Sequence, residues 1–169
     1  MKESEETAAD AAMVLKCELA GQTLRMFGTL RMRTTGTSML PAVWPGDTLR
    51  VERAGIEQLS ENDIALYTRD GRLFAHRLIS IARHPENPTV ITQGDAMLRP
   101  DKPVSSGELL GRVTHLVHAG IESEPPKVLS FGERLMAHLA RRSQWAIRLF
   151  VFLHTQRRTP RERIALCQN

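Results

Sequence analysis

The stretch Thr34-Thr-Gly-Thr-Ser-Met-Leu-Pro-Ala-Val-Trp-Pro-Gly-Asp-Thr-Leu-Arg-Val51 links one strand-like segment to the next. Pro45-Gly46 suits a type II turn, because proline fixes the first central position and glycine tolerates positive φ at the second. Gly36 permits a sharp turn just before Ser38. The stretch therefore predicts a serine presented at the end of a strand in a β-rich fold.

Short strand-like runs continue on both sides of this stretch, from Thr29 to about Gly120, and turn residues separate them. Asp70-Gly71 is typical of a hairpin tip. Many short strands favour a compact barrel-like or folded sheet, so we expect a mainly β fold. The predicted strands are Leu30–Thr34, Thr48–Arg53, Ile64–Tyr67, Leu73–Ile81, Thr89–Thr92 and Leu110–His118.

Helical patterns flank the strands. Apolar residues at helical spacing predict an amphipathic helix from Thr7 to about Phe27, with a candidate break at Gly21. After a Glu-Pro-Pro linker, one amphipathic helix is predicted from Phe131 to about His154, with Pro160 limiting its extent. We therefore divide the chain into an N-terminal helix (1–28), a β-domain (29–121), and a linker with a basic helical tail (122–169).

Length and composition narrow the class of protein. A chain of 169 residues, 41% of them hydrophobic, can bury one core without disulfides or metals. Cys17 and Cys167 form no metal-binding pattern, so we expect reduced cysteines, no metal and no organic cofactor. No secretory signal and no run of about 20 apolar residues is present. These features predict a cytoplasmic protein, either free or peripheral at the membrane.

The C-terminal region is strongly basic. The segment from Glu133 to Arg163 contains eight arginines and only two acidic residues, Glu133 and Glu162. Such a region suits an anionic membrane surface or an acidic partner, and it equally suits a solvated helical face. Nucleic acid is not expected, because no reading module or stacking platform is present. The apolar residues between the arginines would lie in a lipid interface or pack on the β-domain: Trp145, Ile147, Leu149, Phe150, Phe152 and Leu153.

Three segments carry residue types that nucleophilic catalysis uses. The backbone N–H of Ser38 would lie near its own hydroxyl and suits an oxyanion donor. Alternation along Leu73–Ile81 places His76 on one face, where a neutral imidazole can take a proton. Asp95 and Asp101 lie six residues apart in a turn-rich loop, and a carboxylate there can orient the imidazole. Each residue taken alone also has a structural explanation. The alternating face holds Phe74, His76, Leu78 and Ser80, opposite Leu73, Ala75, Arg77, Ile79 and Ile81.

The order of these motifs along the chain resembles that of one family. The order is Ser-Met-x-Pro with Gly-Asp, then His-Arg on a strand, then Gly-Asp with a second Asp six residues later. That family is the type I signal peptidases in their Ser/His/Asp form, the eukaryotic, archaeal and sporulating-bacterial branch of the S24/S26 serine peptidases. The bacterial Ser/Lys branch and the self-cleaving LexA-type repressors place lysine where this chain has His76. The resemblance covers about Leu30 to Val117 and includes Leu110-Gly-Arg-Val113.

The resemblance implies the convoluted β-fold of that family and a serine endopeptidase that prefers small residues before the scissile bond. Ser38 would be the acylated nucleophile, His76 the general base and Asp101 the acid that orients it. Asp95 would support the site or take part in its proton network. Some bacterial relatives carry an oxyanion-donating serine at the position of Gly36, so here backbone N–H groups would have to suffice. The remaining support would come from Gly36, Met39, Pro41, Gly46, Asp47 and Gly94.

Two features depart from the family and keep alternatives open. A polar-faced helix stands where signal peptidases carry a membrane anchor, and the arginine-rich helix has no counterpart. One alternative is a self-processing regulator that cuts at Ala20-Gly21, although about 27 residues are too few for a helix-turn-helix domain before the first strand. The other is a non-catalytic module on the same fold that binds a membrane or a partner through the basic helix.

Overall fold

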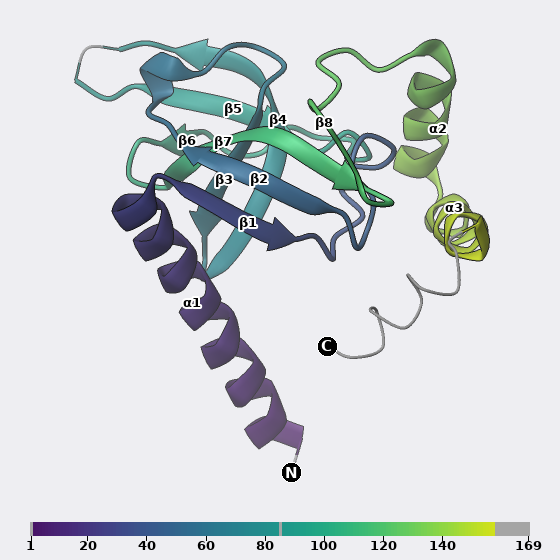
Figure 1. The fold of residues 1–169 in the computed structure, drawn as a ribbon, viewed down its shortest axis with the longest axis horizontal. Coiled ribbons are helices and arrows are strands. Elements are labelled where there is room, and N and C mark those ends of the chain that lie inside the picture. Colours follow the sequence, from purple (N-terminus) through teal and green to yellow (C-terminus); the bar gives the residue numbers. More distant parts are fainter. Residues whose placement is uncertain (1, 85, 158–169) are drawn as a thin grey trace.

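An antiparallel, curved sheet forms the centre of the structure, a computed structural model that describes residues 2–84 and 86–157 (Figure 1). Its strands follow the order β1-β2-β7-β3-β4-β5-β6, and β8 pairs with β7. This mainly β class, with helices at both ends of the chain, confirms the predicted class. The strands are β1 (Thr29–Arg33), β2 (Thr48–Arg53), β3 (Ile64–Arg69), β4 (Arg72–Ala82), β5 (Thr89–Gln93), β6 (Val104–Ser105), β7 (Leu109–His118) and β8 (Ile121–Ser123).

All six predicted strands are present, with ends that differ by at most two residues. The short strands β6 and β8 were not predicted, because two or three residues carry no detectable alternation. The predicted alternation along β4 is wrong beyond Leu78, since the register with β5 shifts between Leu78 and Ser80. This bulge moves Ile81 to the side of Phe74 and Leu78, where all three pack in one cluster.

Both predicted turns have the required backbone. Asp70 and Gly71, with φ of 50° and 68°, form the two-residue connection between β3 and β4. Gly46 has φ of 91°, and the Asp47 N–H donates to the Trp44 carbonyl at 3.0 Å, as a type II turn requires. The Gly46 turn thus leads from the loop that carries Ser38, called here the serine loop, into β2, and the Asp70-Gly71 turn joins the strands of the hairpin that carries His76.

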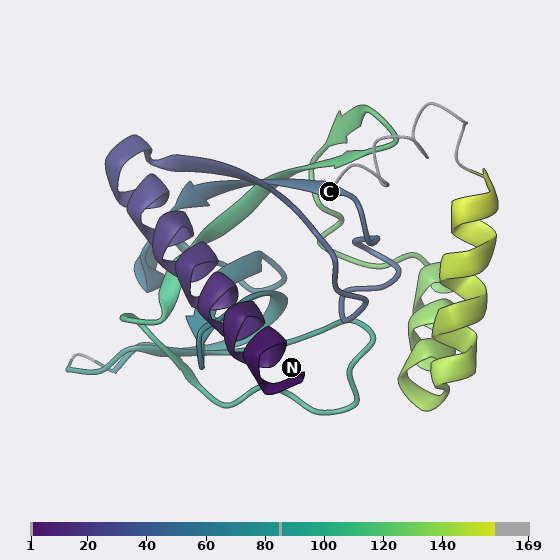
Figure 2. The same ribbon diagram turned by 90° about the horizontal axis from the view of Figure 1, so that it is seen from below.

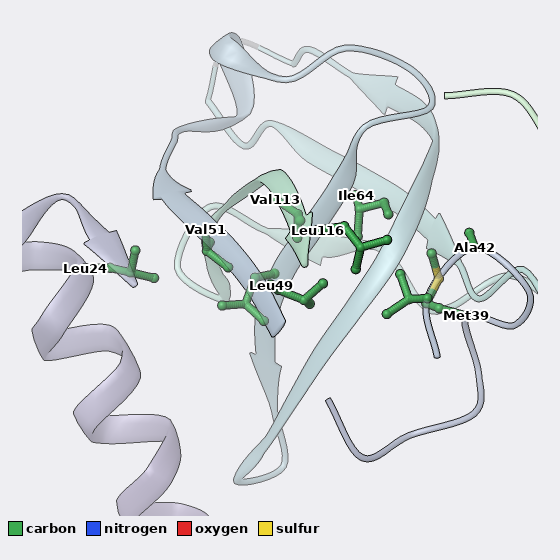
Figure 3. Close-up of a cluster of buried hydrophobic side chains, with 10 residues drawn as sticks. Leu24, Met39, Ala42, Leu49, Val51, Ile64, Val113 and Leu116 are labelled. Carbon is green, nitrogen blue, oxygen red and sulfur yellow. The ribbon is translucent and has the colours of Figure 1, made fainter. Parts of the chain in front are cut away.

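The sheet buries a cluster on each face, because neighbouring residues on a strand point to opposite sides. On β3, Leu66 belongs to the first cluster, whereas Ala65 and Tyr67 belong to the second. Figure 3 shows the first cluster, which extends from α1 (Lys2–Phe27) to the loop after Ser38. Its buried members are Leu24, Met39, Ala42, Val43, Leu49, Val51, Ile64, Leu66, Val113 and Leu116. The second also includes Ile56 of the 3-10 helix η1 (Ile56–Gln58).

Helix α1 is continuous, so the candidate break at Gly21 is wrong. Gly21 lies against Leu110, with 3.7 Å from the position of an added Cβ to the Leu110 side chain, and Leu24 is buried in the first cluster. The helix is therefore held from its middle to its C-terminal end, and its first turns extend away from the sheet (Figure 1). Cys17 on this helix is buried, and burial raises the pKa of its thiol; Cys167 lies outside the described residues.

Two helices, α2 (Phe131–Arg142) and α3 (Gln144–Arg157), replace the single C-terminal helix that the sequence predicted. Ser130 caps α2 and exchanges hydrogen bonds with Glu133 in a capping box. Ser143, in an extended conformation, separates the helices. Both lie at the opposite end of the sheet from α1 (Figures 1 and 2). None of the helices in the described part of the chain is long and apolar enough to cross a membrane. Pro160 and Arg158 to Arg163 lie outside it.

Candidate active site

Ser38 lies in the loop between β1 and β2, and a second loop fixes its position. The Ala96 N–H donates to the Ser38 carbonyl oxygen at 2.8 Å. Gly94 makes this approach possible, since a Cβ there would lie 2.6 Å from that oxygen and 3.2 Å from the Ser38 Cβ. Glycine at position 94 therefore acts through close packing against the serine backbone.

His76 extends from the middle of β4 toward Ser38. Its side chain is buried, and its Nε2 lies 2.9 Å from the Ser38 Oγ. Its Nδ1 lies 2.7 Å from the Asp101 Oδ2. An ionised carboxylate can only accept, so Nδ1 carries the proton and Nε2 accepts from the serine hydroxyl. This tautomer leaves His76 ready to take the Ser38 proton.

Asp101 is held in its ionised form by the groups around it. Burial raises the pKa of this carboxyl, but hydrogen bonds from His76 and Thr92 together lower it below the ordinary value of 3.8. The Thr92 Oγ1 donates to the Asp101 Oδ2 at 2.8 Å, and the Asp101 N–H donates to the Thr92 carbonyl at the same distance. The end of β5 thereby sets the orientation of the acid.

Tyr67 and Thr92 contact the site, and the sequence prediction did not assign them a function. The Tyr67 Oη lies 3.4 Å from the His76 Nδ1, and its ring stacks on Phe74. Burial raises the pKa of Tyr67 to about 12, so the hydroxyl stays protonated. The register of the β3–β4 hairpin is the signal that could have found Tyr67. Ala65 pairs with His76, and Tyr67, two residues after Ala65, lies on the same face of the sheet as His76.

Of the two functions expected for Asp95, the contacts favour support of the site over a place in the proton network of His76. Asp95 forms a two-pronged ion pair with Arg77, in which Nε and Nη2 donate to the two carboxylate oxygens at 2.8 Å each. Arg77 also donates to the Asn62 and Pro126 carbonyls. Because Arg77 follows His76 on the strand, it points to the opposite side. Asp95 therefore supports the loop from behind the site.

The other predicted support residues surround the serine loop in different ways. Met39 and Gly36 line the cavity next to Ser38, and Pro41 is buried after a cis peptide bond. Gly36 is not required for a sharp turn, since its φ is not positive and an added Cβ would meet nothing within 4 Å.

Asp47 and Gly46 close the far end of the serine loop. The buried Asp47 accepts from the Trp44 N–H at 2.7 Å through Oδ2, and its Oδ1 lies 2.7 Å from the His118 Nδ1. The Gly46 N–H donates to the Thr34 carbonyl at 2.7 Å. These bonds connect the loop after Ser38 to the end of β7 and keep its two ends together.

The C-terminal helices pack on the back of the loops that carry Ser38 and Asp95. Leu40 from the serine loop and Ala96 from the aspartate loop are buried with Ala140 of α2. The Arg141 Nε donates to the Asp95 carbonyl at 2.8 Å. The sequence left open whether six apolar residues of this region pack on the β-domain. Two of them, Ile147 and Phe150, pack here. The other four are largely exposed: Trp145, Leu149, Phe152 and Leu153. The predicted tail thus contributes to the support of the site.

A cavity of about 400 Å³ opens beside Ser38 and His76, between the end of β1 and the first half of β4. Met32, Leu73 and Ala75 line it from the strands, and Met13 and Lys16 line it from α1. A second cavity, of about 280 Å³, lies near Asp63, and none of Ser38, His76 and Asp101 lines it. Within residues 2–84 and 86–157, no group of three His, Cys, Asp or Glu side chains is placed to hold a metal.

Comparisons with known proteins give no relative: no family model matches the chain, and a search of curated proteins finds no significant match.

Proposed function

We propose that this protein is a serine endopeptidase of the signal-peptidase type, which cleaves a peptide or precursor through an acyl-enzyme. The observation that carries the proposal is the continuous chain of contacts from the Ser38 Oγ to the His76 Nε2 (2.9 Å) and from the His76 Nδ1 to Asp101 (2.7 Å). A nucleophile, a base and an orienting acid within hydrogen-bond reach define this chemistry. The resemblance in the order of the motifs supports the type of fold and the preference for small residues before the scissile bond.

In the proposed reaction, the Ser38 Oγ attacks the scissile carbonyl carbon while the His76 Nε2 takes the hydroxyl proton. The carbon–nitrogen bond then breaks, and the imidazolium gives that proton to the leaving amine. A water molecule attacks the ester while His76 takes one of its protons, and the ester bond breaks as His76 returns that proton to Ser38. The product leaves as a carboxylic acid, which then releases its own proton to solvent. In this reaction Asp101 stays ionised throughout, and the Ser38 N–H would donate to the oxyanion.

The surroundings of the cavity favour an extended peptide as the substrate. Strand β4 pairs with β3 along Arg72–Arg77, whereas β5 joins its other edge only from Arg77 onward. In the described part of the chain, β1 pairs with β2 alone. Both strands therefore offer an unpaired edge beside the cavity, and an extended peptide can add to such an edge through backbone hydrogen bonds.

Labelling with serine-reactive acylators, read by intact mass, tests the chemistry. We expect one adduct in the wild-type protein, none in Ser38→Ala, and slower labelling in His76→Ala and Asp101→Asn. Ser60→Ala, which removes an exposed hydroxyl outside the cavity, is the matched control and should label like the wild type. A set of small acylators that leaves the folded wild-type protein unmodified would overturn the proposal and favour a binding module.

Cleavage in cis at Ala20-Gly21 is less well supported than cleavage in trans. Both residues lie within the continuous α1, and Ala20 is buried. A protease binds its substrate extended, so this helix would have to unwind before the bond reached Ser38. Purified protein is therefore expected to keep its full mass on storage, and loss of residues 1–20 from wild type but not from Ser38→Ala would restore the self-processing alternative.

We also propose that the enzyme works at an anionic membrane surface. On α2, the residues Phe131, Leu135 and Leu139 follow one another at four-residue spacing and are largely exposed, with Arg134 and Arg142 beside them. Exposed apolar side chains among arginines suit an interface with anionic lipid. Trp145 on α3, which is 77% exposed, adds to this surface and lies against Arg148.

Pelleting with phosphatidylglycerol vesicles tests this location. We expect Leu135→Gln with Leu139→Gln to reduce binding while labelling of Ser38 continues, because neither residue belongs to the cluster that packs on the site. Deletion of both helices is less suitable, since it would uncover Leu40 and Ala96. Wild-type protein that stays in the supernatant, with vesicles of any anionic content, would exclude the membrane and leave an acidic protein partner.

A further inference from the structure

The charges around the cavity beside Ser38 are of one sign. Its wall includes Lys16, Arg33 and Arg72, and no aspartate or glutamate lines it. The rest of the lining is largely apolar, as the side chains of Met39, Val43, Leu49 and Leu66 show. A recess with an apolar floor and cationic walls favours a ligand that combines an apolar side chain with a negative charge.

Two of these cations line the same cavity because α1 crosses the tip of the β3–β4 hairpin. A Cβ added at Gly71 would lie 2.9 Å from the Val14 Cγ2, which places this part of α1 directly against the turn. Met13 and Lys16, three residues apart, share one face of the helix and both line the cavity. Arg72 begins β4 immediately after the turn. We call Lys16 and Arg72 the cationic rim.

Among the side chains that the structure describes (residues 10–84, 86–143 and 145–153), neither Lys16 nor Arg72 forms an ion pair. Arg33 differs, since its Nε donates to the Gly46 carbonyl at 3.2 Å and it makes further interactions. Lys16 and Arg72 are therefore the two cations of the wall that remain available to a substrate.

We propose that the cationic rim selects peptides that carry an aspartate or glutamate about four residues before the scissile bond. Arg72 precedes His76 by four residues on β4, and a strand advances about 3.3 Å per residue, so roughly 13 Å separate the two backbone positions. A peptide paired with this edge advances at the same rate. The cavity lies on one side of Ser38. The acyl part of the substrate must stay bound until the ester is hydrolysed, so we place this part, together with its carboxylate, in the cavity.

This inference rests on the proposed function, and peptide phosphonate probes separate the two. Such a probe phosphonylates an active serine and carries its peptide on the acyl side. Three probes differ only at the fourth residue before the reactive phosphorus, which is glutamate, glutamine or lysine. Rates of Ser38 modification are measured by intact mass at low salt. We expect the glutamate probe to react about threefold to tenfold faster than the glutamine probe and the lysine probe to react most slowly.

Charge reversal provides the decisive comparison. In Lys16→Glu with Arg72→Glu, the order of the glutamate and lysine probes should invert, whereas Lys102→Gln, an exposed cation outside the cavity, should leave the order unchanged. Added salt should reduce the preference of the wild type, because exposed charges are screened. Equal rates for the three probes, or a preference that survives charge reversal, would overturn the specificity while leaving the serine chemistry intact. Failure of every probe to modify Ser38 would instead count against the proposed function.

Discussion

Two neighbouring residues of β4, His76 and Arg77, each meet an aspartate from the same loop, and the two pairs have different environments. His76 contacts Asp101 at 2.7 Å beside the cavity, and the Asp101 side chain keeps 16% of its surface exposed. Arg77 meets Asp95 through two bonds of 2.8 Å on the other side of the strand, where the Asp95 side chain is only 6% exposed. One pair is placed for proton transfer, and the other connects the loop to its support.

The difference shows how one loop can supply both an acid for the proposed proton transfer and an acid for stability. A carboxylate beside the base must hold the imidazole tautomer and remain ionised, which requires donors such as Thr92. A buried guanidinium needs its charge balanced and its donors satisfied, which Asp95 and two backbone carbonyls achieve. Removing either acid should therefore damage a different property of the protein.

Asp101→Asn should produce the largest effect, and it should be on activity. The amide can no longer favour the tautomer in which Nε2 accepts from Ser38, so we expect the rate of serine acylation to fall by about 10³- to 10⁴-fold. The urea midpoint should change little by comparison. A variant that keeps acylation within tenfold of the wild type would show that Asp101 does not orient the base.

Asp95→Asn should have the opposite effect, a large loss of stability. It leaves the buried Arg77 guanidinium without its counter-charge, which costs about 3–5 kcal/mol in the free energy of unfolding. Urea denaturation measures the loss, and the fraction that remains folded should still be acylated at Ser38. The double variant Asp95→Leu with Arg77→Met removes both charges and should lose less stability than the single variant. A single variant as stable as the wild type would contradict the structural function of this pair.

Sequence reasoning reached the pairing of His76 with Asp101 through the family resemblance, but not the pairing of Arg77 with Asp95. Alternation and turn residues located the strands, because a half-buried strand and a two-residue turn leave local patterns, as at Asp70-Gly71. The motif order selected Ser38, His76 and both aspartates. Nothing local distinguishes Asp95 from Asp101, since the partner of each acid depends on which face of β4 the loop meets.

The remaining features of the site depend on contacts between distant segments. Tyr67 reaches His76 through hairpin register, and α1 contributes Lys16 to the cavity only because it crosses the β3–β4 turn. The division of the C-terminal helix at Ser143 lets Ala140 and Ile147 meet the catalytic loops from two helices. A single sequence carries such long-range contacts only weakly, and helical periodicity alone predicted one uninterrupted helix.

Gly94→Ala should have an intermediate effect and should disturb the serine rather than either pair. The new methyl group would lie 2.6 Å from the Ser38 carbonyl oxygen and from the Met97 Cγ, so one loop must move. We expect a loss of about 1–3 kcal/mol in the free energy of unfolding together with slower acylation. Gly107→Ala is the matched control, because an added Cβ there meets nothing within 4 Å. Equal behaviour of the two variants in urea and in labelling would show that the Gly94 contact is dispensable.

Thr92→Val should have the smallest effect and should appear mainly at acid pH. Burial raises the pKa of Asp101, and the hydrogen bonds from His76 and Thr92 bring it below 3.8; without the Thr92 donor, the pKa should rise. A lowered folded-state pKa contributes stability that is present above 3.8 and is lost as the pH falls through the folded value. The variant should therefore lose about 1 kcal/mol at neutral pH and begin its acid-induced loss at higher pH. Urea midpoints measured between pH 2 and 7 test this, with Asp101→Asn as the reference that lacks the titrating group. The quantity compared is the difference in urea midpoint from Asp101→Asn. If this difference is the same for Thr92→Val and for the wild type at every pH, Thr92 does not help to keep Asp101 ionised.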